Sequence, residues 1–141
     1  MRISRALTIL VLAFGVTLAA PADDLAEYQP LMQQTAAAVK ELKAHLDAGE
    51  DAEAASKATE VSAGATKMSK WWASKGKKDA AQWSKDIASA AKQIRYMAKK
   101  GDTAGAAAHF KTMTGNCATC HEMYRGKDAD GKWTIKLEPG S

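Results

Sequence analysis

Cysteine is scarce in this sequence: the 141 residues include two, Cys117 and Cys120. His121 follows them directly, and the other two histidines are His45 and His109. A structural zinc ion takes four Cys or His ligands in a tetrahedron. No second Cys or His cluster stands elsewhere in the chain to complete such a set, so the sequence argues against a zinc site.

Runs of β-branched residues are also few, and the chain beyond its first 22 residues is rich in Ala, Lys, Glu and Met. A thioredoxin-like dithiol needs a strand, a turn and a helix around its C-x-x-C motif, and nothing near Cys117 indicates a strand. The composition instead favours helices. The sequence therefore predicts an all-α protein.

A long hydrophobic run is missing as well, since spanning a bilayer takes about 20 apolar residues. The apolar run 6–18 is shorter, follows two arginines and precedes small residues at 20–22. This order is typical of a secretory signal peptide. We expect residues 1–22 to be removed before Asp23, leaving a periplasmic protein without a membrane span. An uncleaved anchor is the alternative interpretation.

Net charge is low once the signal peptide and its two arginines, Arg2 and Arg5, are removed. The Lys and Arg count falls from 20 to 18 against 16 Asp and Glu, so the formal balance falls from +4 to +2. Such a weak balance gives little long-range attraction for a polyanion, and export keeps the protein away from nucleic acid. The sequence therefore argues against a nucleic-acid partner.

Helical periodicity is the main pattern that the sequence does contain. Apolar residues recur at alternating spacings of three and four, as in a helix with one buried face. Gly49, Gly76 and Gly101 separate the periodic segments, as glycine does after a helix. We expect helices at about 25–48, 51–73, 79–99 and 103–125. Four helices with short connections predict an antiparallel, up-down-up-down four-helix bundle.

Some local details follow from the same pattern. Asp79 is the expected N-cap of the third helix, and Asp102 or Thr103 caps the fourth. Pro30 is either the first residue of the main first helix or a kink one turn in. Trp72 lies on the apolar face of the second helix, so we expect its neighbour Trp71 to point away from that face.

The chain therefore divides into three parts. Residues 1–22 form the expected signal peptide, residues 23–125 the four-helix domain, and residues 126–141 a C-terminal tail. The tail lacks helical periodicity. We expect it to be a surface segment whose Trp133 packs back on the bundle.

The most specific motif in the chain is Cys117-Ala118-Thr119-Cys120-His121. It has the C-x-x-C-H form that attaches a c-type haem, with each thiol adding to a porphyrin vinyl group. On a helix, its two Cys and its His stand at i, i+3 and i+4 and share one face. A plain disulfide would leave His121 without a role. We predict one covalent haem c on Cys117 and Cys120, with His121 as the proximal iron ligand.

The chain from about Leu25 to Arg125 resembles the class II c-type cytochromes, the family of the cytochromes c-prime and their low-spin relatives. The resemblance rests on a haem motif close to the C-terminus of a four-helix protein. It also rests on Tyr124 and Arg125 after the motif and on Phe110 seven residues before its first Cys. In class I cytochromes the motif lies near the N-terminus instead.

The resemblance implies that the first helix covers the distal face of the haem. Low-spin members present a Met ligand there, whereas c-prime members present a non-ligating side chain and keep a five-coordinate iron. Met32 stands at the matching place and is either a core Met or the distal thioether ligand. Gln29 stands where members often carry an Arg near the propionates, whereas Arg125 matches the Arg after the motif and is a candidate propionate contact.

We expect a monohaem carrier of single electrons between redox partner proteins, with His121 proximal and Met32 distal. The first alternative is a five-coordinate protein that binds nitric oxide or carbon monoxide. The second is a non-haem bundle with a disulfide or metal at the two cysteines. An enzyme is not expected, because no acid/base or nucleophile constellation stands out. The resembled family includes helix-paired dimers, so a homodimer is left open.

Lysines gather around the second connection, at positions 67, 70, 75, 77 and 78. They form either a solvated loop or a docking surface that steers an acidic redox partner.

Replacing both Cys117 and Cys120 by Ala should abolish covalent haem, because the porphyrin vinyl groups lose their thiol partners. Haem staining after denaturing electrophoresis measures the loss, with the wild-type band as the stained control. Haem that stays with the double variant through the gel would contradict attachment at these residues.

Overall fold

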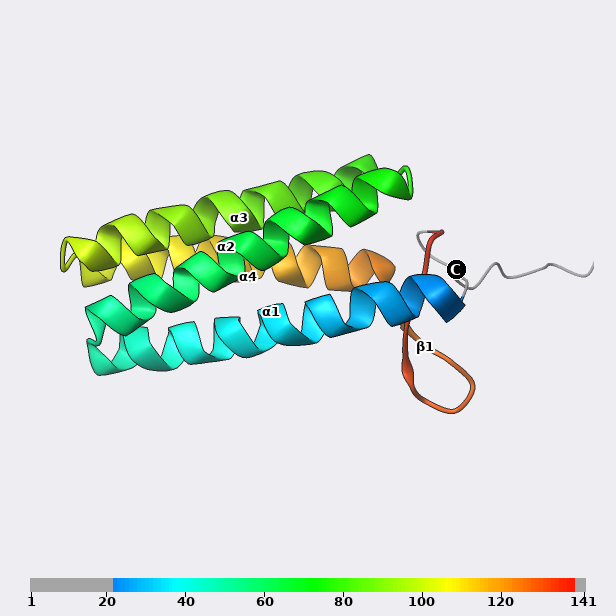
Figure 1. Ribbon diagram of the computed structural model, residues 1–141, viewed down its shortest axis with the longest axis horizontal. Coiled ribbons are helices and arrows are strands. Elements are labelled where there is room, and N and C mark those ends of the chain that lie inside the picture. Colours follow the sequence, from blue (N-terminus) through cyan, green and yellow to red (C-terminus); the bar gives the residue numbers. More distant parts are fainter. Residues whose placement is uncertain (1–21, 139–141) are drawn as a thin grey trace, which may run out of the picture.

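The computed structural model describes residues 22–138, so the expected signal peptide lies outside the described residues apart from Ala22. The described chain is predominantly helical and forms a helical bundle, in which the four helices lie side by side (Figure 1). The helices are α1 (Ala22–Ala48), α2 (Asp51–Ser74), α3 (Lys78–Lys99) and α4 (Thr103–Tyr124). The prediction of an all-α protein with four helices is confirmed. None of the described helices is long and apolar enough to cross a membrane.

The helix ends agree closely with the sequence pattern. Gly49, Gly76 and Gly101 follow their helices at φ angles of 71°, 72° and 69°, the left-handed conformation that glycine adopts without steric cost. The Asp102 carboxylate accepts a hydrogen bond from the Gly105 N–H at 2.8 Å and so caps α4 as expected. The largest difference is at the start of α1, which begins at Ala22.

One local prediction is corrected, and one of the two interpretations of Pro30 is excluded. The N-cap of α3 is Lys77, and Asp79 lies in the first helical turn. The Asp79 carboxylate accepts the hydroxyl of Tyr124 from α4 at 2.8 Å, while its position in the first turn still suits the helix dipole. Pro30 does not begin a helix, because α1 runs through it from Ala22.

Helix α2 packs against both α1 and α3, and α3 packs against both α2 and α4. Residues later in α1 contact residues earlier in α2. Tyr28 contacts Trp72, and Glu41 pairs with Lys57. Between α2 and α3, the Ser62 hydroxyl donates to the Ala88 carbonyl at 3.2 Å. Buried alanines on both helices let them approach closely; they include Ala54, Ala58, Ala65, Ala80, Ala88 and Ala91.

Helices α1 and α4 make little direct contact with each other. A short hairpin lies beside the start of α1 and the end of α4 (Figure 1). Its strands are β1 (Arg125–Lys127) and β2 (Trp133–Ile135), which pair antiparallel. Ile135 is buried at 7% exposure, whereas Trp133 is 49% exposed. The tail therefore anchors to the bundle through Ile135, while Trp133 stays at the surface.

The contact between α1 and α2 depends on a glycine, which leads to a prediction. A Cβ at Gly64 would overlap the Thr35 hydroxyl, which donates to the Leu31 carbonyl at 2.8 Å. Gly64→Ala should therefore lower the free energy of unfolding by about 1–3 kcal/mol in urea denaturation.

Gly115→Ala is the matched control, because a Cβ there meets nothing within 4 Å. It should raise stability by about 0.5–1 kcal/mol through helix propensity alone. In a Thr35→Ala background the Gly64→Ala penalty should largely disappear. Equal effects at Gly64 and Gly115 would show that the close approach at Thr35 is unimportant.

Candidate functional site

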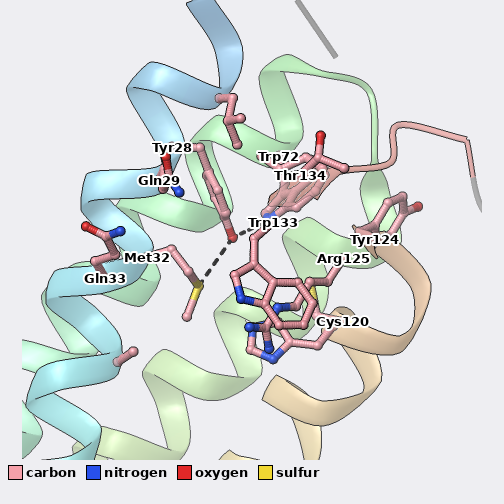
Figure 2. A pocket seen from close by; sticks show the side chains of 14 residues that line it. Tyr28, Gln29, Met32, Gln33, Trp72, Cys120, Tyr124, Arg125, Trp133 and Thr134 are labelled. Carbon is pink, nitrogen blue, oxygen red and sulfur yellow. Dashed lines mark hydrogen bonds between the residues drawn. The ribbon is translucent and has the colours of Figure 1, made fainter. Parts of the chain in front are cut away.

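A pocket of about 260 Å³ opens between α1, α4 and the hairpin, with Trp72 of α2 at its inner end (Figure 2). It forms where α1 and α4 make little direct contact. The lining residues are Leu25, Tyr28, Gln29, Met32, Gln33, Ala36, Trp72, Cys120, His121, Tyr124, Arg125, Trp133, Thr134 and Ile135.

The pocket brings together most of the site residues that the sequence indicated. Met32 reaches it from α1, and Cys120, His121 and Arg125 reach it from the end of α4 and the start of the hairpin. Cys117 does not line the pocket; it is half-buried and packs against the core one turn earlier on α4. Both cysteines are free thiols in this structure.

Tyr28 holds the α1 side of the pocket together. The Trp72 indole N–H donates to the Tyr28 hydroxyl oxygen at 2.9 Å, and both side chains are buried. The Tyr28 hydroxyl lies 4.0 Å from the sulfur of Met32 (Figure 2). It lies 3.5 Å from the sulfur of Met68. Burial raises the pKa of Tyr28 well above its usual range, with the nearby Cys120 adding to the effect. The hydroxyl therefore keeps its proton and can donate to a sulfur.

Met32 is half-buried and extends from α1 into the pocket (Figure 2). The Tyr28 hydroxyl is closer to Met68 than to Met32, so the Met32 sulfur keeps lone pairs available for another partner. Four residues, one helical turn, separate Tyr28 from Met32, which puts both on the same face of α1. That spacing was the available signal for the role of Tyr28, which the sequence analysis missed.

The titratable groups of the motif are neutral in this environment. Burial lowers the pKa of His121, and the positive charge of Arg125 adds to the shift, so the imidazole has a free lone pair at neutral pH. Burial raises the pKa of the Cys117 thiol. Burial, Cys117 and Asp79 together raise the pKa of the Cys120 thiol to about 12. As free thiols, both are protonated and weakly reactive at neutral pH.

The hairpin forms one wall of the pocket, which the sequence analysis did not foresee. The Arg125 guanidinium lies 3.4 Å from the centre of the Trp133 ring, and the Lys127 ammonium lies 4.6 Å from it. This stacking keeps the Arg125 side chain beside the pocket (Figure 2). The aspartate-rich turn before Gly131, followed by the β-favouring Trp133 to Ile135, was the sequence signal for a hairpin.

Other residues from the sequence analysis lie elsewhere. His45 is 2.5 Å from a Glu50 carboxylate oxygen, and neither His45 nor His109 lines the pocket. Phe110 is half-buried against the core. Within residues 22–138, no group of three or more His, Cys, Asp or Glu side chains could hold a metal ion.

The residues of this pocket fit a haem group. The lining is mainly apolar, as a macrocycle requires, and it presents a neutral imidazole from one helix and a thioether from another. A thiol from the attachment motif also faces the pocket. The volume is slightly below the roughly 300–1,000 Å³ of ordinary ligand pockets, so a large flat ligand would extend past its rim.

Comparisons of the chain with protein-family models, with curated proteins and with solved structures found no match.

Tyr28→Phe tests the central hydrogen bond of this site. The substitution leaves the buried Trp72 N–H without an acceptor and should cost about 1–3 kcal/mol of unfolding free energy. Urea denaturation followed by tryptophan fluorescence measures it. Tyr96→Phe is the control: Tyr96 is 51% exposed, so the change should stay within about 0.5 kcal/mol. If Tyr28→Phe lowers the unfolding free energy no more than Tyr96→Phe does, the hydrogen bond does not stabilise the fold.

Proposed function

We propose that this protein is an exported c-type cytochrome that carries single electrons through one covalently attached haem. The observation that carries the proposal is the pocket, which is lined by both Met32 of α1 and His121 of α4. A thioether and an imidazole in one apolar pocket are the ligand pair of an electron-transfer haem. The C-x-x-C-H motif supplies the covalent attachment.

Each residue has a defined part in this proposal. Cys117 and Cys120 would hold the cofactor through thioether bonds, and the neutral His121 would bind its iron. Met32 provides the ligand from the opposite helix, and its thioether favours the reduced state. When bound, the haem supplies a one-electron iron couple.

The surrounding residues control solvent and charge. Trp72 and Ile135 are buried and form apolar walls that exclude water from the ligands. The Tyr28 hydroxyl lies 4.0 Å from the Met32 sulfur and adds a polar group to this apolar wall. Arg125 places a positive charge beside the pocket, where it would balance a carboxylate on the rim of the cofactor.

The proposal includes the antiparallel order of the helices and membership of the class II cytochromes. The antiparallel order is supported by contacts that join later residues of α1 to earlier residues of α2. The late position of the haem motif supports the class. Export to the periplasm is supported by the sequence of residues 1–22 and by the need to attach haem outside the cytoplasm.

A five-coordinate protein that binds nitric oxide or carbon monoxide is the second candidate, and it differs in one residue. If Met32 only packs, the distal side is open to a gas. The Tyr28 hydroxyl, which is 4.0 Å from the Met32 sulfur, would then be a polar group on that side. The first candidate is favoured because Met32 itself lines the pocket.

Visible absorption of the oxidised and reduced protein, before and after carbon monoxide, tests the distal ligand. We expect a low-spin ferrous spectrum that barely responds to carbon monoxide, because Met32 fills the distal position. Met32→Ala should produce a high-spin spectrum that carbon monoxide shifts at once.

Leu31→Ala is the control for this experiment. Leu31 is the chain neighbour of Met32, is also half-buried and does not line the pocket. Its spectrum should match that of the wild type. A wild-type protein that is high-spin and binds carbon monoxide at once would replace the electron-carrier proposal with the gas-binding one.

A further inference from the structure

Two surface grooves flank α2 on the sides facing its neighbours. The groove toward α3 has a volume of about 400 Å³, and the groove toward α1 has a volume of about 570 Å³. Lys67 and Lys70 line both grooves, so they stand on the ridge between them. Lys92 and Arg95 of α3 line the first groove as well. We call these four cations the α2 basic face.

Among the described residues, one carboxylate stands beside the α2 basic face: Glu27 of α1 lines the groove toward α1 and accepts the Trp71 indole N–H at 3.2 Å. All four side chains are exposed, and none of the carboxylates that the structure describes lies within ion-pair distance of them. The pairing of Lys57 with Glu41 at 2.7 Å shows that other lysines of α2 do find partners. The α2 basic face therefore presents a concentrated positive field to an approaching molecule.

This face differs from the lysine patch that the sequence indicated. Lys77 is paired with Glu138 at 3.3 Å, and the Lys75 ammonium lies 5.3 Å from the centre of the Trp71 ring. Lys67 and Lys70 remain from that patch, and Lys92 and Arg95 of α3 join them. Lys78 also stays exposed at the second connection but lines neither groove, so the basic surface extends from that connection onto the two grooves.

The floor between the cations is made of small residues. Ala58, Ser62 and Ala63 contribute little bulk to the groove toward α3. The hydroxyls of Thr59 and Thr66 already donate to backbone carbonyls of α2 at 3.0 and 2.8 Å. The cationic side chains are therefore the main donors that the groove offers to a partner.

The α2 basic face is also connected to the pocket through aromatic contacts. Trp71 lines the groove toward α1 beside Lys67 and Lys70. Its ring centre lies 4.5 Å from that of Tyr28 and 4.9 Å from that of Trp72, and both of those rings line the pocket. A molecule bound on this face is thus separated from the pocket by a continuous layer of packed rings.

We infer that the α2 basic face docks an acidic protein surface, that of the redox partner; this inference rests on the proposed electron-carrier function. Lysines 67 and 70 on α2 and the cations at 92 and 95 on α3 are spread along the groove. Spread charges suit a protein surface bearing several carboxylates better than a single anion. A membrane surface is disfavoured because the exposed large apolar side chains of the described chain, Tyr96 and Trp133, line neither groove.

The test maps an acidic probe on the full-length, haem-loaded protein in its ferrous state. The probe is a poly-L-glutamate peptide, and the readout is the shift of backbone amide and indole N–H signals in nitrogen-15 NMR spectra. We expect the shifts to centre on the two grooves and to include the Trp71 indole. Lys67→Glu with Lys70→Glu should weaken binding by at least about tenfold at low salt.

The matched control is Lys85→Glu with Lys111→Glu, which changes the net charge equally at two exposed lysines outside both grooves. It should weaken binding by less than about threefold. Equal losses in the two double variants would overturn the inference, since net charge alone would then explain binding. Shifts centred on the hairpin cations Arg125 and Lys127 would overturn it too.

Two further probes separate the other anionic partners. Inorganic phosphate, or vesicles containing phosphatidylglycerol, that bind the α2 basic face more tightly than the peptide would overturn docking of a protein. Haem staining of the same samples tests the proposed function separately from the binding of the peptide. Protein without covalent haem would refute the cytochrome, whereas the peptide map would still decide whether the α2 basic face binds acidic chains.

Discussion

The hydrogen bond between the Trp72 indole and the Tyr28 hydroxyl is the contact on which the rest of the site depends. It ties α1 to α2 inside the core, where an unpaired N–H would be costly. It also fixes the Tyr28 ring, which lies beside Met32 and packs against Trp71. The distal wall of the pocket, the direction of the candidate ligand and the aromatic layer beneath the α2 basic face therefore share one polar contact.

The position of the pocket follows from how side-chain size is distributed in the bundle. Alanines and serines let α2 and α3 approach closely, and the same applies where Gly64 of α2 meets Thr35 of α1. Larger rings occupy the end of the bundle near Trp72 and Tyr124, where α1 and α4 make little contact. Close packing along α2 thus leaves an opening between α1 and α4, and the C-x-x-C-H motif ends in that opening.

Charged side chains also differ between the faces of the bundle. The carboxylates of Glu41, Glu60 and Glu138 are engaged by lysines, whereas the α2 basic face has no such partner among the described residues. Arg125 stacks on Trp133 at the mouth of the pocket. The proposed cofactor site and the inferred docking surface therefore lie on different sides of Tyr28, Trp71 and Trp72. This arrangement would let a partner bind without displacing the hairpin.

Local residue types determined the four helices, the glycine turns, the Asp102 cap and the shared face of the C-x-x-C-H residues, because each depends on neighbours within about one turn. Other features depended on contacts between distant segments. Adjacent residues of a helix point about 100° apart, yet both Trp71 and Trp72 are buried, because α2 has a neighbouring helix on more than one side. The same holds for Asp79, which bonds Tyr124 of α4 rather than capping its own helix, and for the hairpin wall at Trp133. Helix rotation and packing decided these contacts, because the pattern of a single segment says which residues share a face but not what that face meets. The same applies to Lys67 and Lys70, which form no ion pair with the carboxylates of residues 22–138.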